Sequence, residues 1–572
     1  MATAPYKPGD EERDLYYFGF AGEPKLVARM SQHRWVKPEY KEWDDFGQVP
    51  KRYRAICDAI PTWTRDVSVR IVEALKKCAW SYFFPVRIGF ETVCFVGAPP
   101  NTFLIVLLIA VEEDSLQWEA GIAVALQCRD ILREHEISDV EVEIREGKHV
   151  YHAASKKLEA QVDPQAWGSS PTATNQFIAP MLSYSGYPVR YYHDRNGEGT
   201  IGLHIKLEGD ESTTYGLTCR HVVYNSRPPQ ESFKISTEEE PQYHVQASTE
   251  GYERCLFKIG EHQKRLEYHV SRLRDIHTRW EEWYSTSPEV WENKRPTERQ
   301  TRLLLRFEKV LLYTKEIIEC LKGIESKDER RIGRLAFHPN FEISTLKPGY
   351  LKDWALIELD TKKFLNGLGN KVFMGNCDFA IADPCYGVDR SPSPEELDNG
   401  FLTLTLAEEP EGQSSTWVGK RGAASGLTFG IKSAIEAVVR RPGCGTEDMY
   451  AWEMLIVPDK WYGTKFSKEG DSGSCVFDIY DGRIIGLVTG SNGAKPVQQE
   501  IWRGIPAIEG DPSSSRQLKE YPGKGISPKS TGETPVQRLR AYEEGTDITF
   551  VSPIEWVLED IQDFTGLKPQ LA

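Results

Sequence analysis

Residues 470–477 read Gly-Asp-Ser-Gly-Ser-Cys-Val-Phe, and this stretch decides the fold. Glycine on both sides of Ser472 permits the backbone conformations of a sharp turn, which other residues rarely adopt. Such a turn would project the hydroxyl of Ser472 and direct its own N–H and that of Gly470 toward one point. An apolar strand, Cys475–Phe477, follows at once. By itself, the pattern is equally typical of an ordinary β-turn rich in glycine and serine.

Two other segments supply the partners that a nucleophilic serine requires. A serine that attacks a carbonyl needs a base to take its proton and a carboxylate to orient that base. His221 lies in the run Thr218–Val223, at the end of a strand-like segment, and Asp353 opens the apolar run 353–359. Alone, His221 is more simply explained as a partly buried histidine, and Asp353 as a turn residue. Their combination with Ser472 makes them candidates for catalysis.

The order His, Asp, Ser along the chain is that of the chymotrypsin-like serine protease family. Thr218–Val222 resembles the family's Thr-Ala-Ala-His segment, and Asp353–Ile357 resembles its Asp-Ile-Ala-Leu-Leu segment. Gly470–Gly473 is similar in every residue to its Gly-Asp-Ser-Gly signature. The resemblance covers roughly residues 178–250 and 328–565. The chain as a whole is also similar to large intracellular trypsin-like proteins of filamentous fungi.

The resemblance implies a role for each residue of the site. His221 would be the general base and then the general acid, and Asp353 would hold its tautomer. The N–H groups of Gly470 and Ser472 would form the oxyanion hole. We therefore expect a serine endopeptidase that hydrolyses peptide bonds through an acyl-enzyme on Ser472.

The same resemblance implies where the substrate, a protein or peptide, would bind. One wall of the pocket would come from the segment around Phe466, and the other from Thr489 and Gly490. A trypsin-type pocket would place an acidic residue near position 466, which is phenylalanine here, so a preference for lysine or arginine is not supported. We expect no cofactor and no metal.

The distribution of apolar and turn-forming residues along the chain predicts a multidomain α+β protein. Residues 1–170 mix helical and strand periodicity and predict a small α/β or α+β accessory domain of unknown role. From residue 171 to 572, short strands broken by glycine, proline and aspartate predict a β-sandwich or barrel. With the resemblance, we expect an all-β double six-stranded barrel of trypsin-like type in this second domain.

Two segments interrupt that domain. Residues 251–327 carry apolar side chains every three, four and seven positions, which predicts an antiparallel αα-hairpin of coiled-coil type. Its end with Trp280 and Trp283 is a candidate contact surface for a protein partner, although aromatics at this spacing more often belong to a core. Residues 508–540 are rich in serine, proline, glycine and charge, and predict a mobile loop.

Composition excludes several other classes of function. The net charge of −15 argues against nucleic acid as a partner, because phosphate binding requires concentrated lysine and arginine. The longest apolar run, residues 103–111, is far shorter than the roughly 20 residues that span a membrane, so we expect no membrane partner. The start of the chain lacks the features of a secretory signal, and the 11 cysteines are scattered without a CxxC pair. We therefore expect a cytoplasmic protein with reduced thiols.

Asp471 raises the question of latency. In secreted relatives, the equivalent carboxylate pairs with an N-terminus freed by cleavage, yet here about 180 residues precede the barrel. We hypothesise that the enzyme is latent until it is cut near residues 170–185 or meets a partner. The alternative is that Asp471 finds a partner inside the protein. Two other functions also remain open, a catalytically silent scaffold on a protease fold and an esterase that uses the same residues.

Overall fold

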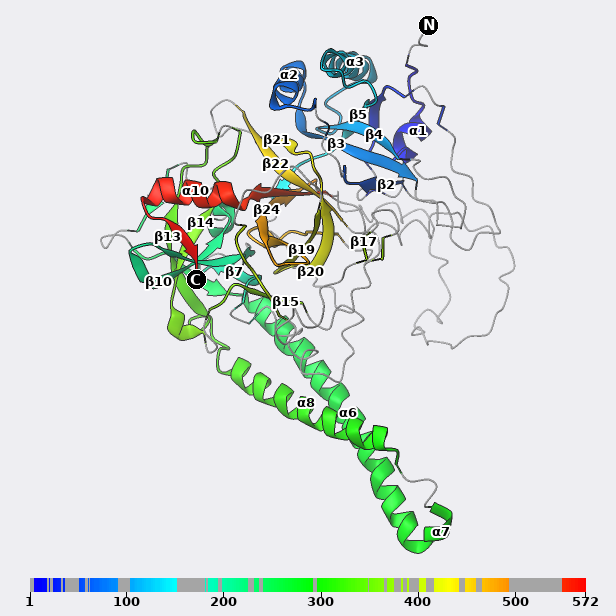
Figure 1. The fold of residues 1–572 in the computed structure, drawn as a ribbon, viewed down its shortest axis with the longest axis vertical. Helices are drawn as coiled ribbons and strands as arrows, with labels where there is room; N and C mark the ends of the chain where they lie inside the picture. The colour runs from blue at the N-terminus through cyan, green and yellow to red at the C-terminus, as the bar shows by residue number, and fades with distance from the viewer. Residues whose placement is uncertain are drawn as a thin grey trace, which may run out of the picture.

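The computed structural model places a β-rich body between an α/β layer and a long helical hairpin (Figure 1). The structure describes residues 5–35, 51–90, 103–151, 181–224, 231–374, 401–407, 416–441, 448–458, 465–492 and 548–572, together with the short strands at 382–383 and 388–389. Short gaps within these ranges fall at 18–19, 21–23, 32–33, 57–59, 61, 182–183, 194–197, 236–239, 292–295, 348 and 365–367. The linker-like residues 168–175 and the loop predicted at 508–540 lie outside the described residues.

A closed antiparallel barrel forms one half of the β-rich body. Within the described residues it has six strands, joined in a ring because the first pairs with the last. In ring order they are β22 (Met449–Pro458), β20 (Gly426–Lys432), β19 (Thr416–Gly422), β23 (Cys475–Asp478), β24 (Ile484–Ser491) and β25 (Thr549–Pro553). A buried cluster that includes Val418, Ile456 and Val488 draws on these strands. Such β-branched residues suit a pleated surface that is covered by neighbouring strands.

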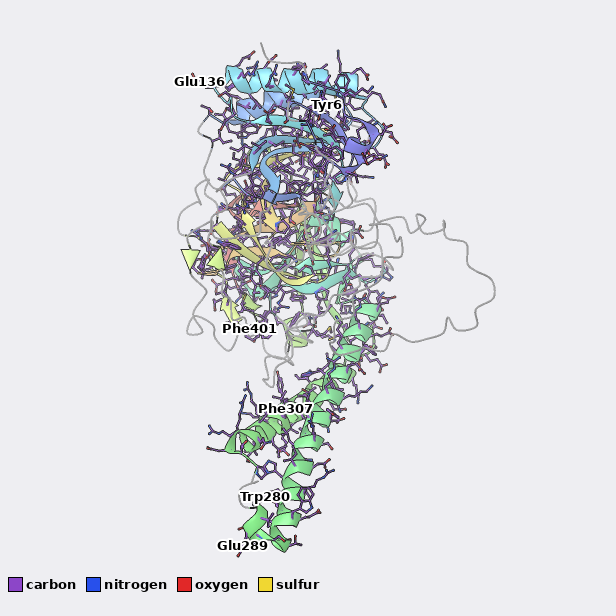
Figure 2. The ribbon with its side chains drawn as sticks, turned by 90° about the vertical axis from the view of Figure 1, so that its right-hand side faces the viewer. Tyr6, Glu136, Trp280, Glu289, Phe307 and Phe401 are labelled. Carbon is purple, nitrogen blue, oxygen red and sulfur yellow. The ribbon has the colours of Figure 1, made fainter. Side chains whose placement is uncertain are left out.

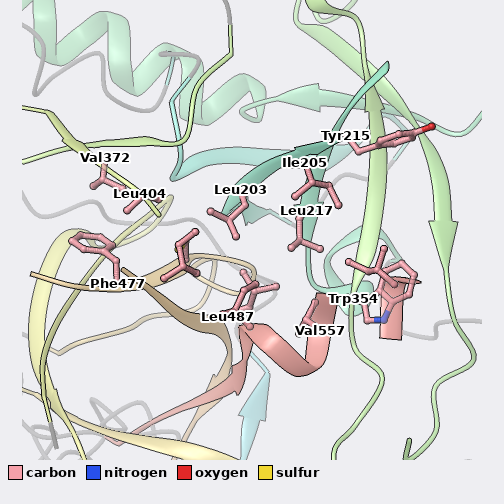
Figure 3. Packing of buried hydrophobic residues seen from close by; sticks show 14 of the residues in the cluster. Leu203, Ile205, Tyr215, Leu217, Trp354, Val372, Leu404, Phe477, Leu487 and Val557 are labelled. Atoms are coloured by element: carbon pink, nitrogen blue, oxygen red, sulfur yellow. The ribbon is translucent and has the colours of Figure 1, made fainter. Parts of the chain in front are cut away.

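A second antiparallel sheet curves against the barrel as a half-barrel. Its described strands are, in spatial order, β26 (Pro569–Leu571), β9 (Leu203–Leu207), β10 (Asp210–Thr218), β14 (Ala355–Leu359), β13 (Arg331–His338), β12 (Tyr243–Gln246), β7 (Tyr187–Tyr191) and β8 (Gly199–Ile201), with β11 (Phe233–Lys234) also paired to β13. Figure 3 shows Leu203, Leu217 and Trp354 of this half packed toward Leu487 of the barrel. Val557 of α10 (Ile554–Thr565), the closing helix, joins the same core. The protein is therefore α+β, with one closed barrel and one half-barrel.

The N-terminal layer has its own helices, but it shares a sheet with the barrel. The strands β1 (Leu26–Arg29), β5 (Glu141–Glu146), β4 (Leu104–Val111) and β3 (Trp80–Phe90) lie in this order, with β2 (Lys51–Arg54) also paired to β3. The helices are α1 (Asp10–Leu15), α2 (Arg65–Leu75) and α3 (Trp118–Glu134), the last two packed on one face of the sheet. β3 pairs with β21 (Ala437–Arg441), so one described sheet of 13 strands runs through both units.

The helical segment expected over 251–327 forms a long hairpin that projects from the body (Figure 2). It consists of α6 (Thr249–Thr286), the short α7 (Pro288–Trp291) and α8 (Glu298–Lys322). Side chains near the base, such as Ile259 and Leu266, are buried between the helices. Further out, Trp283 is 44% exposed, and Trp280 stacks on Tyr284 with ring centroids 4.8 Å apart. A protein partner at this end stays a prediction.

Among the helices that the structure describes, none combines the length and the apolar character that crossing a bilayer requires.

Candidate active site

His221 and Asp353 meet where two neighbouring strands of the half-barrel begin and end. Thr218, the last residue of β10, lies opposite Ala355, the first residue of β14. This register brings the turn after β10 beside the residues that precede β14. His221 lies in α5 (Arg220–Val223), a single helical turn. Its Nδ1 donates to Oδ2 of Asp353 at 2.6 Å, and its backbone N–H donates to Oδ1 at 3.1 Å.

The contacts of Asp353 keep it ionised and fix the tautomer of His221. Burial alone would raise the pKa of Asp353, but the charge of His221 and its hydrogen bonds outweigh burial, so the pKa lies below its ordinary value. An ionised carboxylate accepts hydrogen bonds only, so Nδ1 of His221 carries a proton. In the neutral imidazole, Nε2 is then the basic nitrogen.

Ser472 lies on a sharp turn between the barrel strands and the half-barrel. Gly470 and Gly473 adopt φ values of 103° and 86°, the left-handed region that favours glycine. A side chain on Gly473 would also lie only 2.3 Å from the carbonyl oxygen of Thr200. The hydroxyl of Ser472 donates to the carbonyl of Thr489 at 3.1 Å, and Ser472 is fully buried. The two amides predicted to form an oxyanion hole, those of Gly470 and Ser472, both belong to this turn.

A shared carbonyl brings the serine and histidine segments together. The backbone N–H of Gly473 donates to the carbonyl of Val488 at 2.8 Å. The thiol of Cys219 donates to the same oxygen at 3.2 Å. Gly473, which follows Ser472, and Cys219, two residues before His221, thus donate to the same carbonyl oxygen. The structure therefore places the predicted base and the predicted nucleophile on adjoining segments of its two β-units.

Thr200 on β8 is a positioning residue that the sequence did not reveal. Its backbone N–H donates to the carbonyl of Ser472 at 2.9 Å, and its hydroxyl donates to the carbonyl of Gly470 at 2.9 Å. The hydroxyl of Thr218 donates in turn to the carbonyl of Thr200 at 2.7 Å. One buried threonine of the half-barrel therefore supports both sides of the serine turn.

Asp471 has its partner inside the protein. Lys420 on β19 contacts it at 2.9 Å, and both side chains are fully buried. The carboxylate also accepts hydrogen bonds from the amides of Ala424, Ser425 and Lys468 and from the hydroxyl of Ser425, at 2.6–3.1 Å. Burial raises the pKa of Asp471, but the Lys420 charge and these donors outweigh it, and the pKa is lowered. The structure thus has the internal partner that was the alternative to a freed N-terminus.

The residues predicted to line a substrate pocket occupy two different places. Thr489 and Gly490 follow Val488 on β24, directly beside the hydroxyl of Ser472. Phe466, by contrast, is fully buried in the apolar cluster of the barrel, and its carbonyl accepts from the hydroxyl of Thr428 at 2.6 Å. The side chain of Phe466 therefore contributes to the core of the barrel.

A buried ion pair beside Thr489 was also missed by the sequence analysis. Arg441 on β21 pairs with Glu453 on β22, and both side chains are buried. Glu453 accepts a hydrogen bond from the hydroxyl of Thr489, and Nη1 of Arg441 lies 2.7 Å from Nδ1 of His149. These contacts link the N-terminal layer to β24.

Cys219, His221 and Asp353 are near enough to suggest a metal site, since their ligand atoms lie within 4.8 Å of one another. A cysteine binds metal as a thiolate. Burial raises the pKa of Cys219 well above its ordinary value, and the protonated thiol donates to the Val488 carbonyl. This contact favours a positioning role for Cys219 over metal ligation. The six cysteines that the structure describes are all free thiols.

His338 predicts an acid sensitivity of the histidine segment. Its Nδ1 lies 2.9 Å from the carbonyl oxygen of Pro339 and 3.1 Å from Nε of Arg220, next to His221, and burial with the Arg220 charge lowers its pKa to about 4. An unfolded histidine has a pKa near 6.5, so the unfolded chain binds more protons between about pH 6.5 and 4. Stability must therefore fall as the pH drops through this window.

We expect the urea midpoint of unfolding to decrease between pH 7 and pH 4, and less steeply in His338→Gln than in the wild type. The exposed His193→Gln is the matched control and should follow the wild-type slope. Equal slopes for all three proteins would show that His338 does not couple stability to pH.

A scan against protein-family models finds no match for this chain, and a search of curated proteins finds no similar sequence.

Proposed function

We propose that the chain is a serine endopeptidase of chymotrypsin-like type, with Ser472 as nucleophile. One observation supports this most strongly. The His221–Asp353 pair and the Ser472 turn come from different β-units, yet Cys219 and Gly473 bind the same Val488 carbonyl. An ordinary turn rich in glycine would not be expected to lie beside a histidine whose tautomer is fixed by a buried carboxylate.

In this proposal, each residue has a defined chemical task. Nε2 of His221 takes the proton of the Ser472 hydroxyl as its oxygen attacks the peptide carbonyl. The resulting oxyanion is stabilised by the N–H groups of Gly470 and Ser472. The imidazolium then gives its proton to the leaving amine, and water hydrolyses the acyl-enzyme by the same route. Asp353 remains ionised throughout and stabilises the imidazolium.

In the resting structure, the Ser472 hydroxyl donates to Thr489. Catalysis on this proposal requires the hydroxyl to leave that carbonyl and turn to His221. Asp471 needs no new N-terminus for its charge, because Lys420 compensates it. The proposed reason for any latency is therefore access to Ser472, which is fully buried.

Fluorophosphonate labelling tests the nucleophile directly. We expect the probe to label the protein, either in full-length form or after limited proteolysis near residue 175, and to label neither Ser472→Ala nor His221→Ala. Ser552→Ala is the matched control, since Ser552 is a buried serine on β25, outside the serine turn, and it should keep the label. Peptide and ester turnover, each compared with Ser472→Ala, then separates an endopeptidase from an esterase. A folded protein that no treatment makes reactive would favour the catalytically silent scaffold.

A further inference from the structure

One edge of β24 is paired first with β23 and then, beside Ser472, with the serine turn. On one side of β24, β25 pairs along the strand as far as Ser491. On the other side, β23 pairs with β24 only as far as Leu487, which lies opposite Cys475. Beyond it, the serine turn itself contacts the edge, with Gly473 N–H on the Val488 carbonyl and the Ser472 hydroxyl on the Thr489 carbonyl. The next two residues of β24, Gly490 and Ser491, would be an open edge.

A two-residue strand from the N-terminal layer fills this edge. β6 (Val150–Tyr151) pairs with β24 in antiparallel register, with Tyr151 opposite Gly490 and Val150 opposite Ser491. Since the two strands run in opposite directions, β6 runs toward Ser472 as its residue numbers increase. A peptide that presents a carbonyl to Ser472 from its N-terminal side would follow the same path in the same direction.

β6 is held in place by the layer that precedes it. Only residues 147–149 separate β6 from β5, and Gly147 N–H donates to the Val111 carbonyl at 2.8 Å. The ring of His149 stacks on Phe550 with centroids 5.4 Å apart. Phe550 is the partner of Gly490 on the opposite side of β24. His149 also contacts Arg441, whose partner Glu453 binds Thr489. The strand is thus anchored at the residue that immediately precedes it.

We propose that β6 is an autoinhibitory occupant of the edge of β24 at Gly490–Ser491, the edge along which a peptide substrate of the proposed enzyme would lie. This inference rests on the proposed function, since it assigns the regulation of the same site. An unpaired strand edge recognises any extended backbone through its N–H and carbonyl groups. A substrate can pair there only after β6 leaves, because both would use the same hydrogen-bonding groups.

Peptide binding tests the site without relying on catalysis. In a Ser472→Ala background, Val150→Pro with Tyr151→Pro removes both backbone donors of β6, whereas Val150→Ala with Tyr151→Ala keeps them. A fluorescent peptide of residues 145–151 should bind the double-proline variant at least tenfold more tightly than the double-alanine variant, measured by fluorescence anisotropy. Equal affinity, with both variants folded, would overturn the proposal.

A reversible lock tests the same inference if the proline variant unfolds. Opposed residues of an antiparallel pair have Cα atoms at distances that a disulfide can bridge. Val150→Cys with Ser491→Cys, oxidised, should lower fluorophosphonate labelling of Ser472 at least tenfold, and a reductant should restore it. Labelling that the lock leaves unchanged would contradict the inference.

The two measurements also separate this inference from the proposed function. If the peptide binds the double-proline variant but Ser472 is never labelled in that variant with its serine restored, the edge is a peptide-binding site on a catalytically silent protein. If labelling is rapid in the wild type and no variant changes it, Ser472 is a nucleophile and β6 does not guard it.

Discussion

Replacing Asp353 with asparagine should lower peptide turnover by about 10⁴-fold while the protein stays folded. Asp353 accepts two hydrogen bonds from His221, one from the backbone N–H and one from Nδ1. An asparagine of the same size can present its NH₂ group to Nδ1, and Nδ1 must then accept. The ring proton would move to Nε2, which could no longer take the proton of Ser472.

The measurement is kcat/KM for a peptide substrate, in the full-length chain and in the background whose β6 carries the two prolines. The matched control is Glu358→Gln on β14, the strand that Asp353 precedes, where Glu358 pairs with Arg334 at 3.0 Å and lies outside the site. The control should retain turnover within about twofold, as expected of a surface pair. Turnover of Asp353→Asn within tenfold of the wild type would exclude the proposed role of Asp353.

Replacing Lys420 with methionine should lower the free energy of unfolding by about 3–5 kcal/mol, the cost of leaving a buried charge without its partner. Lys420 and Asp471 contact each other at 2.9 Å, and both are fully buried. Methionine fills most of the volume of the lysine but leaves the Asp471 carboxylate without a compensating positive charge. Because Asp471 immediately precedes Ser472, we also expect fluorophosphonate labelling to be lost.

Urea unfolding provides the measurement, and an exposed ion pair provides the control. Lys347 contacts Glu559 at 2.8 Å, with the two side chains 40% and 52% exposed, so Lys347→Met should cost no more than about 1 kcal/mol. Adding Asp471→Asn to Lys420→Met removes the buried charge and should recover part of the loss. If Lys420→Met proved no more costly than Lys347→Met, the internal pair would not support the serine turn.

Local patterns made some elements visible in the sequence. The apolar run 103–111 contains β4, and the helical hairpin begins within two residues of its expected start. These elements are visible in sequence because their apolar period matches the geometry of a single helix or strand. The three motif residues were also identifiable, because His221, Asp353 and Ser472 each lie in a segment of distinctive sequence.

Long-range partners could not be read in the same way. Lys420 lies 51 residues before Asp471, and nothing in its own segment marks it as a buried cation. Thr200 acts through backbone and hydroxyl contacts with the serine turn, and nothing in its own strand distinguishes it from other threonines. Barrel closure depends on the pairing of β22 with β25, and the strand β6 has only two residues, too few to show a period. Each of these features exists only once distant segments have packed.

The length of α6 determines what the hairpin can do for the site. With 38 residues and a rise of 1.5 Å per residue, the helix is about 57 Å long. A protein held near its far end would therefore be bound about one helix length from the β-rich body, from which the hairpin projects (Figure 2). Such a protein would be tethered, and any flexible segment long enough to reach β24 would arrive there at an effective concentration set by the tether rather than by bulk solution. The hairpin would then choose the substrate by proximity, while the edge of β24 would accept whatever extended segment is delivered.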